Sequence, residues 1–252
     1  MKVSIITPCY NSVSTIGKTI DSIRSQTYID IEYIVIDGGS LDGTFDILQN
    51  RKSEIDYLIS EKDKGIYDAI NKGLEIASGD IIGILNSDDI FFDDRVIDKI
   101  VDVFINKKAV NCVYGNLIFV DKKERIKRTW KSKKFRQGFF EESWTPAHPT
   151  FYCRSIVYKE LGKYKIDYKI ASDVDFMFRA LEIKEYKSWF INDYLIKMST
   201  GGVSNQGLKS LWIIIKEIRR SFHENNRTLN IPKYIFYKLL KFREFSYFSK
   251  LR

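Results

Sequence analysis

Short apolar runs alternate with segments whose apolar residues recur every three to four positions through the first half of this 252-residue chain. A short apolar run predicts a buried β-strand, and the three-to-four spacing predicts an amphipathic helix. The expected strands cover 3–7, 33–36, 55–59 and 81–85. One expected helix begins after a Ser14 cap, a second follows a turn at 38–44, and two more cover 66–77 and 96–104. This alternation predicts an α/β fold in which helices cover both faces of a mostly parallel sheet.

A polar, turn-forming cluster follows each of these expected strands, and several of the clusters are acidic. Asp37 ends the second strand, and the run Asn86-Ser87-Asp88-Asp89 follows the fourth. Parallel strands end at one edge of a sheet, where ligands bind. Neighbouring carboxylates there need a cation or a donor-rich ligand to offset their repulsion. A divalent cation shared with substrate phosphates meets that need, and the alternative is an Asp-rich turn that caps the next helix.

A nucleotide diphosphate suits such an edge, because its base and ribose offer hydrogen-bond donors and its diphosphate brings a metal ion. The chain has no Gly-x-Gly-x-x-Gly run and no phosphate-loop lysine motif. Their absence argues against a dinucleotide site and against an ATP-hydrolysis site.

Composition indicates a globular protein, with 44% hydrophobic and 29% charged residues. No apolar run approaches the roughly 18 residues that a membrane span needs, and the apolar stretch at the N-terminus is too short for a signal peptide. Cys9, Cys112 and Cys153 share no metal-like spacing, so reduced thiols are expected. These features predict a protein that is made and kept in the cytoplasm.

The net charge of +8 lies wholly in residues 205–252, which hold 11 Lys and Arg against 3 Glu. This asymmetry predicts a main domain over 1–204 and a tail of basic amphipathic helices over 205–252, the second beginning near Pro232. Basic helices that carry Trp and Phe suit an anionic membrane surface, here the inner face of the cytoplasmic membrane. The alternative is a helix packed on the main domain with a solvated basic face. Nucleic acid is not an expected partner, because the sheet edge is acidic and no nucleic-acid-binding motif is present.

Several segments together carry a resemblance to a known family. They are 4–11 (SIITPCYN), 34–44 (IVIDGGSLDGT), 63–73 (DKGIYDAINKG), 86–89 (NSDD), 148–150 (HPT) and 171–176 (ASDVDF). In this order they resemble the family 2 glycosyltransferases, inverting enzymes of the GT-A fold that use nucleotide-diphosphate sugars. The resemblance covers about residues 2–204 and implies a Rossmann-like central sheet. It also implies a nucleotide-sugar-binding half over 1–110 and an acceptor-binding half over 111–204.

The resemblance also implies roles for individual residues. The implied donor site comprises Pro8, Tyr10, Asn11, Asp37, Lys64, Asn71 and Asp88. Asp37 would accept hydrogen bonds from the base and Asp88 from the ribose. Asp89 would bind Mn²⁺ or Mg²⁺ on the diphosphate, and Asp173 would be the catalytic base.

Residues on the acceptor side each have a second interpretation. Asp173 precedes an apolar helical face, so it could also be only a helix cap, and Asp175 competes with it or supports the site. His148 could bind acceptor or metal, or be a packed hydrogen-bonding residue. Trp144 could stack on a sugar or fill the core.

The expected function is transfer of one sugar, from a UDP-sugar as first choice, to a hydroxyl of a glycan or lipid-linked acceptor. Bacterial surface-polysaccharide assembly is the setting that the resemblance implies. Two alternatives remain: a nucleotidyltransferase, which would release pyrophosphate, and a non-catalytic membrane-bound assembly factor.

Overall fold

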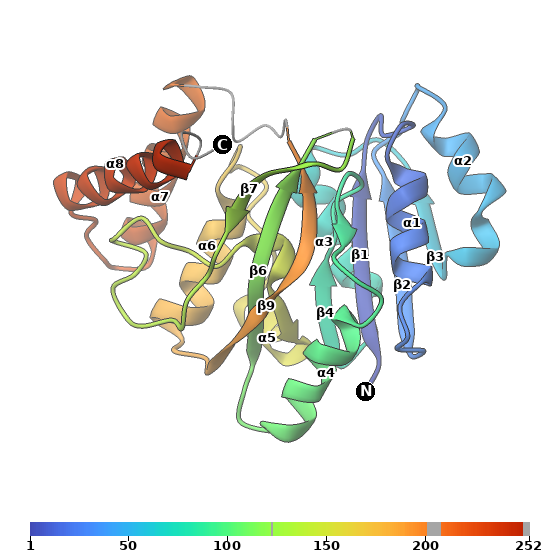
Figure 1. Ribbon diagram of the computed structural model, residues 1–252, viewed down its shortest axis with the longest axis horizontal. Helices are drawn as coiled ribbons and strands as arrows, with labels where there is room; N and C mark the ends of the chain where they lie inside the picture. Colours follow the sequence, from blue (N-terminus) through green and yellow to red (C-terminus); the bar gives the residue numbers. More distant parts are fainter. Residues whose placement is uncertain (122, 201–207, 249–252) are drawn as a thin grey trace.

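The computed structural model describes residues 1–121, 123–200 and 208–248, with side chains from 210 to 240 in the last segment (Figure 1). The strands are β1 Val3–Cys9, β2 Ile31–Asp37, β3 Tyr57–Ser60, β4 Ile81–Ile84, β5 Ile90–Phe91, β6 Cys112–Val120, β7 Ile126–Trp130, β8 Tyr152–Arg154 and β9 Ser188–Ser199. The α-helices are α1 Ile16–Arg24, α2 Thr44–Asn50, α3 Ile66–Ile76, α4 Val96–Asn106, α5 Ser155–Leu161, α6 Ser172–Phe178, α7 Leu208–Glu224 and α8 Ile231–Phe248. Single turns at Lys52–Glu54, His148–Thr150 and Arg179–Ile183 complete the helical segments.

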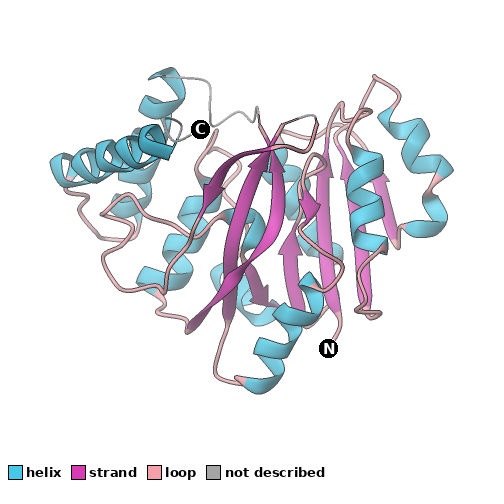
Figure 2. Cartoon of the chain, in the orientation of Figure 1, coloured by secondary structure: helices cyan, strands magenta, loops and turns pink. Residues whose placement is uncertain are grey.

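One sheet runs through the molecule in the order β3-β2-β1-β4-β8-β6-β9-β5, with β7 paired to β6 (Figure 2). Strands β3, β2, β1 and β4 are mutually parallel. Strand β8 then runs antiparallel to both of its neighbours, and β9 is parallel to β6. The expected α/β fold with a mostly parallel central sheet is therefore confirmed for the first half, while the second half is mixed.

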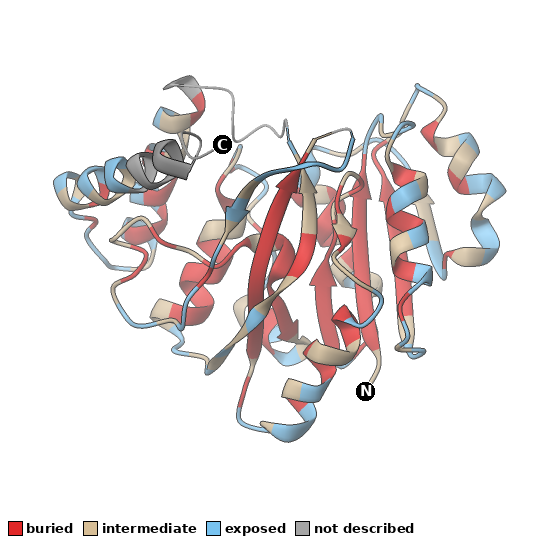
Figure 3. Cartoon of the chain, viewed as in Figure 1, coloured by how far each residue is buried: buried red, intermediate tan, exposed pale blue. Residues whose placement is uncertain are grey.

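Burial on both faces explains the continuous apolar strands. Every residue of β1, β4 and β6 is buried (Figure 3). On one face Ile5 and Val35 pack with the apolar side of α1 and α4, and on the other Ile6 and Ile36 pack with α3, α5 and α6. Two apolar cores thus hold the sheet between helical layers.

The predicted elements match the observed ones to within a few residues, with one local correction. Residue Thr15, not Ser14, precedes α1, and no side chain caps this helix. The backbone carbonyl of Ser12 accepts from the amides of Thr15 and Ile16 instead. The first turn of α1 is therefore closed by the backbone of the loop that follows β1.

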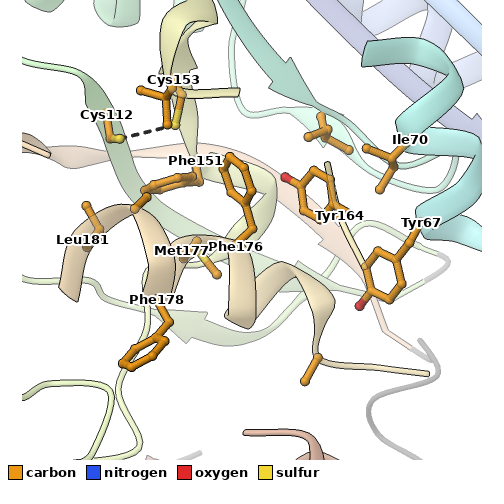
Figure 4. Close-up of a cluster of buried hydrophobic side chains, with 14 of the residues drawn as sticks. Tyr67, Ile70, Cys112, Phe151, Cys153, Tyr164, Phe176, Met177, Phe178 and Leu181 are labelled. Atoms are coloured by element: carbon orange, nitrogen blue, oxygen red, sulfur yellow. Dashed lines mark hydrogen bonds between the residues drawn. The ribbon is translucent and has the colours of Figure 1, made fainter. Parts of the chain in front are cut away.

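Strands β4 and β8 form the seam between the parallel half of the sheet and the mixed half. A Cβ added to Gly83 would lie 1.9 Å from Cε1 of Tyr152, so the tyrosine ring occupies the space that a side chain on β4 would need. Beside this seam Cys153 on β8 lies opposite Cys112 on β6, and their sulfur atoms are 3.3 Å apart (Figure 4). Both thiols are fully buried and unbridged.

The predicted tail helices are present as α7 and α8, and the predicted boundary near 201–204 lies outside the described residues. The apolar face of α7 does not face outward. Its residues Ile215, Ile218 and Phe222 are buried against the main domain, and the Phe222 ring stacks on Phe178 of α6 at 4.3 Å. For these residues the structure favours the alternative of a helix packed on the main domain, whereas Trp212 of the same helix is 70% exposed.

Helix α8 differs from α7, because its large apolar side chains remain exposed. Those side chains are Ile235, Phe236, Leu239 and Leu240. Tyr234 turns inward instead, and Lys233 forms an ion pair with Glu141 at 2.6 Å. Within the described ranges, no helix has the length and hydrophobicity that a membrane crossing requires.

Candidate active site

The carboxyl ends of β1, β2, β3 and β4 meet at one edge of the sheet, at the top in Figure 1. Pairing places Cys9 opposite Asp37 and Asp37 opposite Ser60. The polar clusters after these strands are therefore neighbours, as their spacing in the sequence predicted.

Asp37 is fully buried at this edge and holds three loops together. Its carboxylate accepts hydrogen bonds from the amide and hydroxyl of Ser40 and from the hydroxyl of Ser60, while the Cys9 thiol lies 3.6 Å away. In this arrangement Asp37 is an internal acceptor. Contact with a base requires a serine to rotate away.

Beside Asp37, the missing side chain of Gly38 leaves room for Asp63 and Tyr10. A Cβ at Gly38 would lie 2.5 Å from Oδ2 of Asp63 and 3.3 Å from the ring of Tyr10. The Tyr10 side chain is 61% exposed and free to stack on a planar group. Asp63, which is not among the donor residues that the resemblance implies, therefore lines the same spot. Its position at the start of segment 63–73, in a charged loop after β3, was the sequence signal for it.

The other expected donor residues have mostly local roles. Pro8 is buried within β1. Asn11 joins two loops. Its side-chain oxygen accepts a hydrogen bond from the backbone amide of Leu41, and its backbone amide donates to the Ser40 hydroxyl. The Lys64 side chain is exposed in the loop before α3, and its backbone amide donates to Asp68.

The expectation that Asn71 contacts the donor disagrees with the structure. Its amide nitrogen donates to the carbonyl of Tyr164 at 2.8 Å, and its amide oxygen accepts from the Tyr164 amide at 2.9 Å. Because both polar atoms are engaged and the residue is buried, Asn71 ties α3 to the loop after α5.

Asp89 is the most unusual acid of the edge. It is 0% exposed, and its Oδ2 accepts from the amide of Asn86 at 3.0 Å. Its Oδ1 has no hydrogen-bond partner in the described part of the chain. Burial and the neighbouring charge of Asp88 raise its pKa well above the usual range, against the opposing effect of Asn86 and the Ser199 backbone. Burying an ionised carboxylate oxygen without a partner is costly unless a cation meets it or the carboxyl group takes up a proton.

Asp88 is half-buried, and burial raises its pKa as well. The loop that carries both acids is anchored from below, since the Thr19 hydroxyl donates to the carbonyls of Ser87 and Asp89. No group of three or more His, Cys, Asp and Glu residues capable of holding a metal ion occurs among the described residues. The pair nevertheless fits Mg²⁺-type sites, which use one or two carboxylates together with phosphate oxygens.

Asp173 lies in the first turn of α6 within a cluster of aromatic and polar groups. The Tyr67 hydroxyl donates to the carbonyl of Ile170 and lies 3.3 Å from Oδ1 of Asp173. The Tyr67 ring is parallel to that of Tyr164, with centroids 6.1 Å apart (Figure 4). Nε2 of His148 lies 3.1 Å from the Tyr164 hydroxyl oxygen. Burial lowers the pKa of His148 despite the opposing charge of Asp173, so this imidazole is neutral at pH 7.

Asp175 is unlike Asp173, because both of its carboxylate oxygens are engaged by side chains inside the protein. It is 0% exposed, pairs with Lys165 at 2.9 Å and with Arg179 at 2.8 Å, and accepts from Ser221 of α7 at 2.6 Å. As a candidate base it is therefore ruled out by its geometry, and it acts within the described structure as a buried ion-pair centre.

Trp144 is also an internal residue. It is buried, and its ring contacts those of Phe139 at 4.8 Å and Tyr114 at 6.1 Å. The possibility that it stacks on a sugar is wrong for this arrangement, since neighbouring aromatic rings cover the indole.

Comparisons with known proteins agree with this geometry. Residues 4–164 match the sequence profile described as glycosyl transferase family 2. An uncharacterized glycosyltransferase of Mycobacterium tuberculosis is 34% identical over 208 residues, which are 81% of this chain and 77% of that protein. The UDP-Glc:alpha-D-GlcNAc-diphosphoundecaprenol beta-1,3-glucosyltransferase WfgD of Escherichia coli is 39% identical over 115 residues, or 45% of each chain.

The fold has counterparts among solved structures. The mannosyltransferase PcManGT from Pyrobaculum calidifontis, solved with GDP-Man and Mn²⁺, superposes with a TM-score of 0.63 at 19% identity. The match covers 88% of this chain and 63% of that one, so the chain spans less than two thirds of that protein. From its profile, its relatives and its architecture, the chain is a member of glycosyl transferase family 2 with the GT-A fold.

Proposed function

We propose that the protein transfers one sugar, with inversion, from a nucleotide-diphosphate sugar to an acceptor hydroxyl. The observation that carries the proposal is the unpartnered, buried Oδ1 of Asp89 beside Asp88, at the sheet edge where the Tyr10 side chain is exposed. A metal ion shared with a diphosphate would stabilise an ionised acid there.

Each group has a distinct part in this proposal. The base stacks on Tyr10 over Gly38, and Asp88 accepts from the ribose. Asp89 holds Mn²⁺ or Mg²⁺, which offsets charge on the departing diphosphate when bound. Asp173 takes the proton of the acceptor hydroxyl as its oxygen bonds to the anomeric carbon and the nucleoside diphosphate leaves with the bond electrons. Such a base contributes about 10²–10⁴ in rate.

Direct displacement by the acceptor oxygen inverts the anomeric configuration, because attack and departure take place on opposite faces of the sugar. A retaining double displacement would need a second carboxylate as nucleophile. Asp175, the acid next to Asp173 in sequence, cannot take that part because it is buried in ion pairs.

For the donor we propose a UDP-sugar, and for the acceptor a lipid-linked glycan at the inner face of the cytoplasmic membrane. The name of WfgD specifies UDP-Glc and a diphosphoundecaprenol-linked acceptor, which supports both choices. The exposed apolar side chains of α8 support the membrane location, since the region 205–252 also carries the whole net positive charge. These observations support our proposal of surface-polysaccharide assembly as the setting.

Thermal-shift measurements with UDP, GDP and their sugars, each with and without Mn²⁺, test the donor. A true ligand stabilises the folded protein by mass action, by about 2.7 kcal/mol at a hundredfold excess over Kd, and the melting temperature rises as a result. We expect the largest shift with UDP and Mn²⁺ together. No shift with any nucleotide would contradict the proposal.

Product analysis separates the two alternatives. A glycosyltransferase releases nucleoside diphosphate from the sugar nucleotide, whereas a nucleotidyltransferase forms pyrophosphate. A non-catalytic assembly factor would release neither, and Asp173→Asn would leave its cellular function unchanged.

A further inference from the structure

Helix α7 reaches the segment that leads into Asp173 through one buried acid. Glu217 is 8% exposed, and its carboxylate accepts the backbone amides of Lys169 at 2.6 Å, Ile170 at 3.1 Å and Ala171 at 2.9 Å. These three donors come directly before α6. A buried carboxylate with three backbone donors is well satisfied, and its hydrogen bonds are charge-assisted.

The same segment is held from the opposite side by α3. The Tyr67 hydroxyl donates to the carbonyl of Ile170, and the same hydroxyl lies 3.3 Å from Oδ1 of Asp173. Segment 169–171 is therefore fixed through its N–H groups by Glu217 and through a carbonyl by Tyr67. Asp173 lies two residues after this segment, so the position of its backbone depends on both Glu217 and Tyr67.

Two further contacts join α7 to α6. The Ser221 hydroxyl donates to Asp175 at 2.6 Å, and the Phe222 ring stacks on Phe178. The family profile ends at residue 164, before α6 begins. The α7 side of this anchoring is thus built from a part of the chain that the family match does not cover, whereas Tyr67 lies within the match.

We infer that Glu217 is a positioning residue for the transfer reaction, and that α7 belongs to the catalytic apparatus rather than being a detachable tail. The inference rests on the proposed role of Asp173 as base. Glu217 acts by setting where the Asp173 carboxylate stands relative to the acceptor hydroxyl. It does not contact substrate itself.

Removing Glu217 has a defined consequence. Glu217→Ala leaves three buried amides without an acceptor, and segment 169–171 can then move. Glu217→Gln keeps the shape and one acceptor oxygen but turns an NH₂ group toward N–H donors, so its effect should be smaller. A displacement of about 1 Å at a reacting group can reduce the rate about 10²-fold.

The first measurement is hydrogen–deuterium exchange of the full-length protein, which needs no substrate. We expect the peptide over 165–175 to exchange faster in Glu217→Ala, with an intermediate rate in Glu217→Gln. The second is UDP release from UDP-glucose or UDP-GlcNAc with Mn²⁺. We expect kcat to fall about 10–100-fold in Glu217→Ala and less in Glu217→Gln, with the donor KM within about twofold of wild type.

Leu229→Ala is the matched control, because Leu229 is a buried tail residue in the same apolar core. It should lower the melting temperature while kcat stays near the wild-type value. Equal loss of kcat in Leu229→Ala, or wild-type kcat and exchange in folded Glu217→Gln and Glu217→Ala, would overturn the inference. Asp173→Asn in the same assay separates the two proposals: if that variant retains turnover, the base assignment is the one that fails.

Discussion

Two of the fully buried aspartates, Asp89 and Asp175, should respond in opposite ways to the same substitution. Asp89 and Asp175 are each 0% exposed. Asp89 has one oxygen without a hydrogen-bond partner within the described residues, whereas Asp175 pairs with Lys165 and Arg179. Replacing aspartate by asparagine removes the charge at nearly constant volume, so the comparison isolates the electrostatic environment.

For Asp89→Asn we expect the metal-free protein to become more stable. A buried, unsatisfied group costs about 1–3 kcal/mol, and more if it is charged. The asparagine oxygen can still accept from Asn86, while its NH₂ takes the place of the unpartnered Oδ1 and removes part of the gain. A net stabilisation of about 1–2 kcal/mol would raise the melting temperature by roughly 2–8 °C for a chain of this size.

For Asp175→Asn we expect a loss of about 3–5 kcal/mol, because breaking the buried pair leaves Arg179 without its carboxylate partner, while Lys165 keeps its ion pair with Glu224. Differential scanning fluorimetry, checked by urea denaturation, measures both variants. The same experiment with UDP and Mn²⁺ should show a shift for wild type and Asp175→Asn and little or none for Asp89→Asn. A lower melting temperature for metal-free Asp89→Asn, or an intact Mn²⁺-dependent shift in that variant, would refute the reasoning.

Three further predictions concern separate parts of the molecule. Asp173→Asn should lower turnover by about 10²–10⁴ while leaving the UDP-induced thermal shift unchanged, and a lost shift would mean that Asp173 serves the donor site instead. Although burial opposes its ionisation, three side-chain donors and a backbone amide lower the pKa of Glu32 to about 2. Because this pKa is depressed on folding, Glu32 stabilises the protein above about pH 4.5, by at most about 3 kcal/mol, and that contribution disappears as the pH falls toward 2. Glu32→Gln should therefore flatten the acid limb of the stability–pH curve, and an unchanged limb would contradict this. Replacing Phe236 and Leu239 together by Ser should weaken sedimentation with anionic phosphatidylglycerol vesicles without lowering the melting temperature, since both side chains are 59% exposed, and undiminished vesicle binding would rule out α8 as the contact.

The fold was largely readable from the sequence because its signals are local. The apolar runs and helical spacings depend on neighbours a few residues away, and they located β1, β2, β4, α3 and α4 closely. The acids Asp88 and Asp89 were identifiable for the same reason, since a polar run directly after a buried strand must lie at the sheet edge.

The interpretations that disagree with the structure depend on long-range partners. Asn71 is engaged by the backbone of Tyr164, 93 residues away, and the partners of Glu217 lie 46 to 48 residues before it. An apolar helical face has the same spacing whether it meets a bilayer or the protein's own core, so α7 could not be assigned from its pattern alone. A buried indole such as Trp144 likewise looks the same in sequence as one that stacks on a sugar.

The seam at Gly83 and Tyr152 has a consequence for the rigidity of the sheet. The Tyr152 ring on β8 fills the space that a side chain at Gly83 on β4 would occupy, so the two halves of the sheet are tightly packed at this point. Sliding one half past the other would drive the ring into the β4 backbone. The two halves of the sheet therefore keep a constant spacing at this point. We expect alanine at Gly83 to force β4 and β8 apart.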